Sequence, residues 1–133
     1  MILDALTEIT IMGVLDRGIP NKECIALRIE RHLNIAQYGL VLGTTIEGTA
    51  MAVPIRDSFF WFGEALLAHG DWIFIYTGSG QNTQTRSIDN TYTNYTLYWN
   101  RPYTALYNSN TVPMIFRVGA VQVHQTPPAL PQK

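Results

Sequence analysis

The sequence predicts an all-β fold, a sandwich or a barrel, in a single domain over residues 1–124. Short segments rich in β-branched and aromatic residues recur along the whole chain, and turn residues separate them at regular spacing. No long segment has the helical spacing of apolar residues that alternates with strands in an α/β fold. About eight strands are therefore expected, with no long helix.

The first two strands are predicted over residues 9–14 and 23–30. In the second, Ile25, Leu27 and Ile29 alternate with other residues and so share one face of a strand. A helix is the alternative for 23–30, because Glu, Ala, Leu and Arg all favour helices. The alternation and the turn residues on both sides favour a strand.

The next segments are read in the same way. Residues 35–42 are expected to form a strand, and 43–48 a turn rich in Thr and Gly. Residues 50–55 resemble a strand, but Pro54 has no N–H for a ladder and belongs at an edge or a strand end. Residues 59–62 are too apolar for a loop and too short for a helix.

The clearest strand is predicted over residues 71–77, where aromatic and β-branched residues occupy both faces. This pattern is expected of a strand that is buried on both sides. The polar residues 81–91 are predicted to be a loop, and 95–99 resumes strand character. The last strands are expected over 112–118 and 120–123.

Composition limits the choice of partner. Charged residues make up only 14% of the chain, the net charge is −1, and the nine Lys and Arg residues are scattered. A nucleic-acid partner is not expected, because phosphate binding needs clustered positive charge. A weakly charged surface resists association poorly, which favours a protein partner or a homo-oligomer.

The sequence also bears on location. Cys24 is the single cysteine, so no internal disulfide forms, as in proteins of a reducing compartment. Residues 1–8 carry acids where a secretory signal carries basic residues, and no apolar run approaches the roughly 20 residues of a membrane helix. A soluble cytoplasmic protein without membrane association is expected, with a proline-rich flexible tail over 125–133.

A family resemblance rests on six short motifs. In chain order they are Glu23–Arg28, Tyr38–Leu42, Phe62, Leu67–Asp71, Ile75–Gly80 and Leu97–Trp99. Together they resemble the lamin tail domain of nuclear lamins and many bacterial proteins. The resemblance implies an immunoglobulin-like antiparallel β-sandwich of about seven to nine strands that serves as a binding or structural module. The family's turn before the last strand has only a partial counterpart in residues 108–110.

No residue pattern supports catalysis, a metal or a cofactor. Cys24 lies in mid-strand among apolar residues, where a buried inert thiol is the ordinary outcome. The three histidines have no metal-ligand spacing, and the acids form no recognisable pair. An enzyme would have to build its site from scattered loop residues such as Asp57, His69 and Asp71. A non-catalytic module is therefore predicted.

The strongest functional feature is a segment of tyrosines among Asn and Thr. The candidate binding residues are Tyr92, Asn94, Tyr98, Tyr103 and Tyr107. By the period-two rule, Tyr92, Asn94 and Tyr98 point outward from a strand whose other residues point inward. Exposed tyrosines anchor protein partners or stack on sugars, although they also simply pair across strands. A protein-interaction module is the first prediction, and a carbohydrate-binding protein is the alternative.

Overall fold

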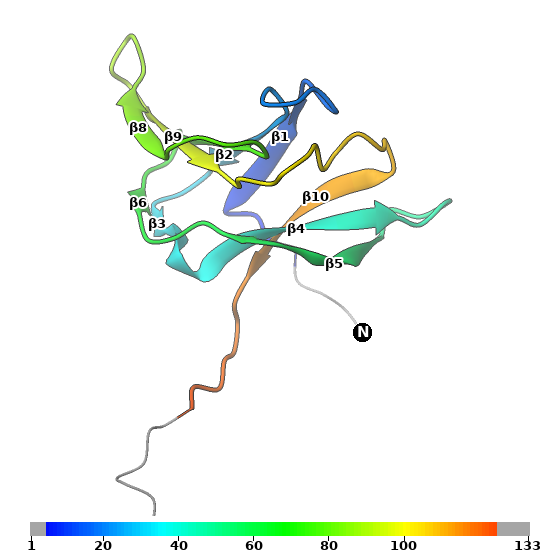
Figure 1. Cartoon of the computed structure of the whole chain (residues 1–133). Coiled ribbons are helices and arrows are strands. Elements are labelled where there is room, and N and C mark those ends of the chain that lie inside the picture. Colours follow the sequence, from blue (N-terminus) through cyan, green and yellow to red (C-terminus); the bar gives the residue numbers. More distant parts are fainter. Residues whose placement is uncertain (1–4, 125–133) are drawn as a thin grey trace, which may run out of the picture.

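The computed structural model describes residues 5–124 and folds them into two layers of β-sheet (Figure 1). The predicted tail over 125–133 lies outside the described residues. The ten described strands are β1 (Ile9–Leu15), β2 (Cys24–Ile29), β3 (Leu33–Asn34), β4 (Tyr38–Thr45), β5 (Ala52–Trp61), β6 (Leu66–Leu67), β7 (Trp72–Tyr76), β8 (Thr83–Arg86), β9 (Thr93–Tyr98) and β10 (Thr111–Arg117). The all-β prediction is confirmed.

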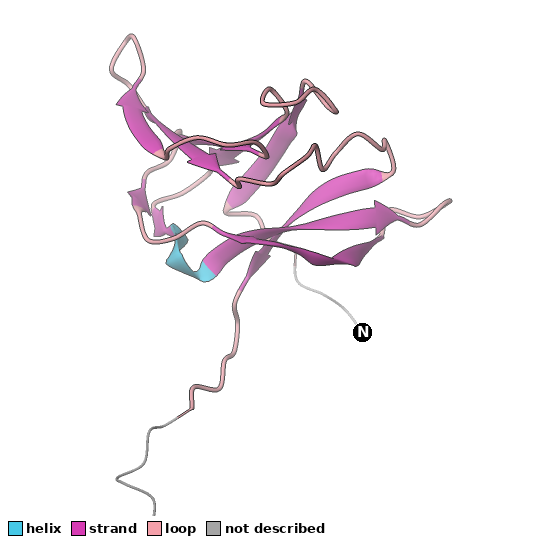
Figure 2. Cartoon of the chain, in the orientation of Figure 1, coloured by secondary structure: helices cyan, strands magenta, loops and turns pink. Residues whose placement is uncertain are grey.

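The two layers differ in size. One is a five-stranded sheet in the order β1-β2-β7-β9-β8, and the other is a three-stranded sheet in the order β10-β4-β5. The short pair β3-β6 lies at one side, next to a single 3-10 turn, η1 (Ile35–Gln37) (Figure 2). Inward side chains of both layers form one apolar core, which has the arrangement of a β-sandwich.

Strand β2 shows why the pattern of residues 23–30 gives a strand. Ile25, Leu27 and Ile29 are fully buried and face the core. Their neighbours Ala26 and Arg28 lie on the outer face, because successive side chains of a strand point to opposite sides. The helix alternative for this segment is wrong.

The segment after β7 departs from its predicted structure. Residues 83–86 of the predicted loop form strand β8, which pairs with β9 at the edge of the five-stranded sheet. All four of its residues are exposed, so its polar sequence gave no sign of a strand. The chain then returns to place β9 beside β7, and these two strands are parallel, whereas every other described pair is antiparallel.

The three-stranded sheet differs from expectation in four places. The strand predicted over 35–42 begins only at Tyr38, because residues 35–37 form the 3-10 turn η1. Strand β4 continues to Thr45, into the predicted turn. The predicted strand over 50–55 and the apolar segment 59–62 belong largely to one strand, β5, which is interrupted by an irregularity at Asp57, whose φ is 61°. There the hydroxyl of Ser58 contacts the backbone N–H and C=O of Leu42. Residues 120–123 form no strand.

Strand β7 is buried on one face only, so the prediction of burial on both sides is wrong. Ile73 and Ile75 are completely buried, whereas Trp72, Phe74 and Tyr76 are half-buried on the outer face. Aromatic and β-branched residues fit a strand whether or not a second layer covers it. No strand or helix of residues 5–124 covers this outer face.

A buried carboxylate fixes the connection between the layers. Glu23 is fully buried and accepts hydrogen bonds from the Thr77 hydroxyl at 2.7 Å and from the backbone N–H of Gly18, Ala105 and Leu106 at 2.8, 2.9 and 3.0 Å. These donors belong to the β1–β2 turn, the end of β7 and the long β9–β10 loop. The β9–β10 loop, which makes the last crossing from one layer to the other, is thereby held against the sheet.

We expect Glu23→Gln to lower the free energy of unfolding by about 3 kcal/mol or more. The amide NH₂ would replace one oxygen and face two donors, which then lose their acceptor inside the protein. Urea unfolding of both proteins measures the change. The matched control is Glu47→Gln on the exposed β4–β5 turn, which we expect to leave the midpoint unchanged. A Glu23→Gln midpoint equal to that of the control would contradict this account.

Candidate functional site

The outer face of the five-stranded sheet carries a groove of about 450 Å³. Its lining residues come from β1, β2, β7 and the start of β9. They are Met12, Gly13, Leu15, Ala26, Trp72, Phe74, Tyr92 and Asn94, and we call them the outer aromatic face. None of them is charged.

The groove arises from the sizes of side chains that the register places next to one another. On the outer face, Gly13 of β1 lies opposite Ala26 of β2, and Ala26 lies opposite Phe74 of β7. Two small residues beside a large ring leave a depression in the sheet surface. On the other side of β7, Trp72 lies opposite Asn94 of β9, which closes the groove with an amide.

Aromatic rings continue along the same face. Trp72 and Phe74 lie nearly parallel, with ring centroids 5.8 Å apart and an interplanar angle of 8°. Tyr76 and Tyr98, on neighbouring strands, are 5.3 Å apart at 18°. Such offset pairs stabilise each other by about 0.5–1.5 kcal/mol beyond the area they bury. The rings are therefore held in fixed positions on the sheet surface.

The structure places the five candidate residues in three different locations. Tyr92 and Asn94 line the groove. Tyr98 points outward, as the period-two rule predicts, but its ring is contacted by Tyr76 and by Gly80. A β-carbon on Gly80 would lie 2.4–2.6 Å from three ring atoms of Tyr98, which shows how closely the backbone covers that ring.

Tyr103 and Tyr107 belong to the β9–β10 loop and not to the groove. They are 69% and 74% exposed, and they lie beside the β1–β2 turn, near Pro20 and Gly18 respectively. Both residues are aromatic, like much of the outer aromatic face, but they lie at a different place on the surface.

Sequence reasoning missed Trp72, Phe74, Met12 and Leu15 as site residues. One signal was present in β7, where the even positions are all aromatic and the intervening positions are both isoleucine. When one face of a strand carries aromatic side chains and the other aliphatic ones, the two faces are expected to have different surroundings. The sequence gave no comparable sign of the groove residues of β1. Their position depends on the β1–β2 register and on an irregularity between Ile11 and Gly13.

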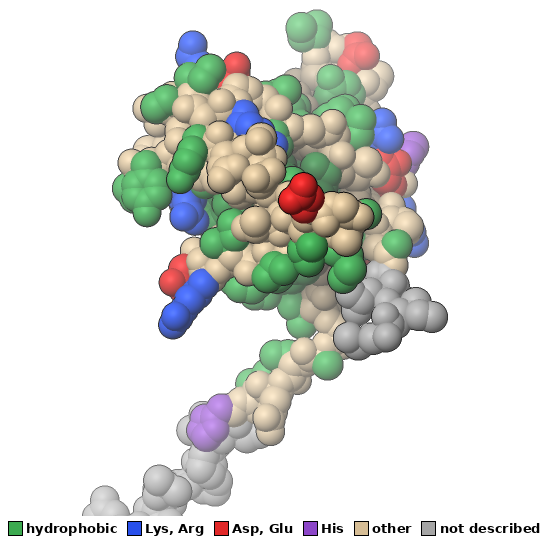
Figure 3. Space-filling view, turned by 90° about the vertical axis from the view of Figure 1, so that its right-hand side faces the viewer, with side chains coloured by type: hydrophobic (Ala, Val, Ile, Leu, Met, Phe, Trp, Pro, Cys, Tyr) green, Lys and Arg blue, Asp and Glu red, His purple; other side chains and the backbone are tan. Residues whose placement is uncertain are grey.

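The charge of Arg28, next to the outer aromatic face, is paired. Arg28 of β2 lies opposite Trp72, and its Nε is 2.6 Å from Oε1 of Glu30. The hydrogen bond from Arg28 lowers the pKa of Glu30. In the space-filling view of Figure 3, acidic and basic side chains are dispersed among hydrophobic and polar ones.

Two groups that the sequence offered for catalysis, Cys24 and Asp71, have structural surroundings. Cys24 is buried, and burial raises the pKa of its thiol to about 11, which disfavours the reactive thiolate. The Asp71 carboxylate accepts hydrogen bonds from the backbone N–H of Ala68 and Thr93. Within residues 5–124, no three His, Cys, Asp or Glu side chains lie close enough together to hold a metal ion.

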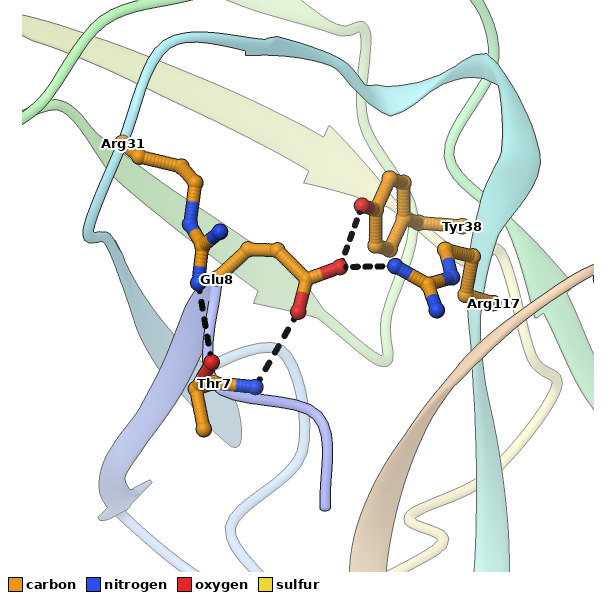
Figure 4. A network of polar contacts seen from close by, with 5 residues as sticks. All are labelled: Thr7, Glu8, Arg31, Tyr38 and Arg117. Carbon is orange, nitrogen blue, oxygen red and sulfur yellow. Dashed lines mark hydrogen bonds and ion pairs between the residues drawn. The ribbon is translucent and has the colours of Figure 1, made fainter. Parts of the chain in front are cut away.

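A second buried carboxylate, Glu8, joins the layers next to the start of β1 (Figure 4). Its Oε2 accepts hydrogen bonds from the hydroxyl of Tyr38 and from Nη1 of Arg117, both at 2.7 Å. The hydrogen bond from Tyr38 is the main cause that lowers the pKa of Glu8 from 4.5 to about 2, and Arg117 adds to it. A carboxyl held ionised in this way is a poor general acid at neutral pH.

In comparisons with known proteins, no family model, no curated protein and no solved structure matches this chain. The resemblance to the lamin tail domain therefore stays a prediction. Among residues 5–124, there is no helix with the length and apolar character needed to cross a membrane.

The lowered pKa of Glu8 predicts acid sensitivity. A carboxyl with a depressed folded-state pKa stabilises the fold above its unfolded pKa, and this contribution disappears as the pH falls towards about 2. We expect Glu8→Gln to lower the free energy of unfolding by up to about 3 kcal/mol near neutral pH and by much less near pH 2. Urea titrations at several pH values measure this difference.

Tyr38→Phe provides the matched variant for this prediction, because it removes the main hydrogen bond and retains the ring. Its stability should depend less steeply on pH in the acid range than that of the wild type. Equal pH dependence in the wild type and Glu8→Gln would show that Glu8 does not carry the effect.

Neighbouring residues of β7 allow a direct test of which face is buried. We expect Ile73→Ala to lower the free energy of unfolding by about 3–4 kcal/mol, because it creates a cavity in the core. Trp72→Ala should lower it by only about 1–2 kcal/mol, since the ring is half-buried and leaves no enclosed cavity. Chemical denaturation measures both, and a larger loss for Trp72→Ala would contradict the assigned faces.

Proposed function

We propose that this protein is a non-catalytic protein-interaction module and that the outer aromatic face is its binding surface. The observation that carries the proposal is the groove of about 450 Å³ beside half-buried Trp72 and Phe74. It lies on a sheet face that no strand or helix of residues 5–124 covers. Apolar depressions with a few polar groups are the usual form of binding sites, and exposed apolar patches often mark interfaces.

The chemistry of the lining suits a polypeptide partner. Met12, Leu15 and Phe74 offer apolar contact to a side chain that enters the groove. Asn94 has both a donor and an acceptor in its amide, as a peptide bond requires of its partner. Trp, Tyr and Met are enriched in protein interfaces, where aromatic residues provide much of the binding energy.

The surface is also rigid, which favours binding. Trp72 and Phe74 stand on a strand whose other face is anchored in the core by Ile73 and Ile75. Their rings already contact each other in the unbound protein. Little side-chain entropy therefore remains to be lost when a partner binds. The binding role that the lamin tail resemblance implies agrees with this proposal.

Carbohydrate binding is the second candidate, favoured by the position of Asn94 opposite Trp72 and next to Thr85 of β8. An aromatic ring can stack on a sugar, and polar side chains beside it can form hydrogen bonds with the hydroxyl groups of the sugar. The groove itself is mainly apolar, however, and a sugar would leave many hydroxyl groups there without partners. The polypeptide partner fits the lining better.

A retention experiment tests the proposal. The immobilised full chain is exposed to an extract of the cells that express it, and the retained polypeptides are quantified by mass spectrometry. We expect Trp72→Ser to retain the specific polypeptides about tenfold less, which corresponds to a loss of about 1.4 kcal/mol. Leu66→Ser is the control, because Leu66 is an exposed apolar residue of the side pair β3-β6.

Identical retention by the wild type and Trp72→Ser would contradict the proposal. A glycan array run with the same proteins separates the two candidates. A sugar that binds the wild type and not Trp72→Ser would favour the carbohydrate-binding alternative.

A further inference from the structure

The three-stranded sheet carries a second aromatic face on its own outer side. Phe59 and Trp61 of β5 are each 55% exposed. Both meet the ring of Phe116 from β10 at nearly right angles, with centroid distances of 5.6 and 5.0 Å. We call Phe59, Trp61, Phe116 and Met114 the second aromatic face.

Two glycines of β4 explain why Phe116 and Met114 lie flat while the rings of β5 project. A β-carbon on Gly39 would be 2.5 Å from Cζ of Phe116, and one on Gly43 would be 2.7 Å from Cε of Met114. Both side chains therefore lie across β4 in the space that the glycines leave. Phe59 and Trp61 stand against this base, and more than half of each remains in contact with water.

The two aromatic faces lie on opposite sides of the sandwich, because each is the outer face of one layer (Figure 1). One face contains a groove, and the other presents projecting rings. We propose that the second aromatic face of one copy of this chain docks on the outer aromatic face of another copy, in a head-to-tail arrangement. This inference rests on the proposed function, for which it names the partner.

Shape favours this pairing over the two symmetric ones. Two outer aromatic faces placed together would enclose two grooves and leave them unfilled. Two second aromatic faces would bring the projecting Phe59 and Trp61 rings of both copies into opposition. In the head-to-tail pairing, a ring enters a groove of about 450 Å³, and the contact approaches the close packing of protein interfaces.

Charge permits the same pairing. The residues of the two aromatic faces are all uncharged, and Arg28, beside the groove, is already paired with Glu30. None of the residues named for the two faces brings a charge into the contact, so these residues add no charge-desolvation penalty to association. Each copy has one face of each kind, and therefore binds two neighbours in an open chain unless the assembly closes into a ring.

Sedimentation of two single-face variants and their mixture tests this arrangement. Wild-type protein should increase in mass with concentration beyond the dimer. Trp72→Ser and Trp61→Ser should each remain monomeric at concentrations where the wild type assembles. An equimolar mixture of the two should form 1:1 dimers and nothing larger, because each variant supplies the face that the other lacks. Leu66→Ser should assemble like the wild type.

Urea unfolding of each variant identifies any loss of assembly that comes from misfolding, and Phe59→Ser replaces Trp61→Ser in that case. A wild type that is monomeric at all concentrations overturns the inference, as does a mixture that stays monomeric. Self-association of Trp61→Ser alone, lost in Trp72→Ser, also overturns it but agrees with the proposed function. The retention experiment judges that function independently.

Discussion

The carboxylate of Glu23 is the contact that fixes the last connection between the two layers, and the position of β10 depends on it. Within the described residues the chain crosses between the two layers three times, and its last crossing, from β9 to β10, is a loop without secondary structure to hold it. Glu23 binds two consecutive N–H groups of this loop, those of Ala105 and Leu106. Arg17 of the β1–β2 turn donates to the carbonyl oxygens of Leu106, Asn108 and Thr111. The loop therefore has a fixed path, and β10 enters its sheet in a defined register.

Glu8 has the corresponding role at the opposite end of the β1–β2 hairpin. Because β1 and β2 are antiparallel, the residues that precede each strand lie at opposite ends of the pair. Glu8 joins β1 to Tyr38 of β4 and Arg117 of β10, and thus binds one layer to the other. Between the two carboxylates, the inward aliphatic residues provide the cohesion of the sandwich. The outer aromatic rings are not needed to hold the layers together, which leaves them available for contact with a partner.

The alternation of β2 was sufficient to predict its core face, because Ile25, Leu27 and Ile29 differ clearly from their neighbours. Strand β8 could not be predicted, since an exposed edge strand needs no apolar residue. The outward positions of Tyr92 and Asn94 follow from period two alone. The rest of the groove does not, because its shape depends on Gly13 and Ala26 lying beside Phe74, and sequence gives no strand register.

The edge strands of the two main sheets have features that disfavour pairing with a strand of another chain. Pro113 in β10 and Pro54 in β5 each remove one N–H from an outer strand, and irregularities interrupt β5 and β1. Strand β8 has only four residues, and short edge strands are poor templates for pairing. Addition of a strand from another chain is thus disfavoured at the edges of the five-stranded and three-stranded sheets. Under the proposed function, association therefore involves the aromatic rings on the outer faces, because burial of their apolar area is favourable.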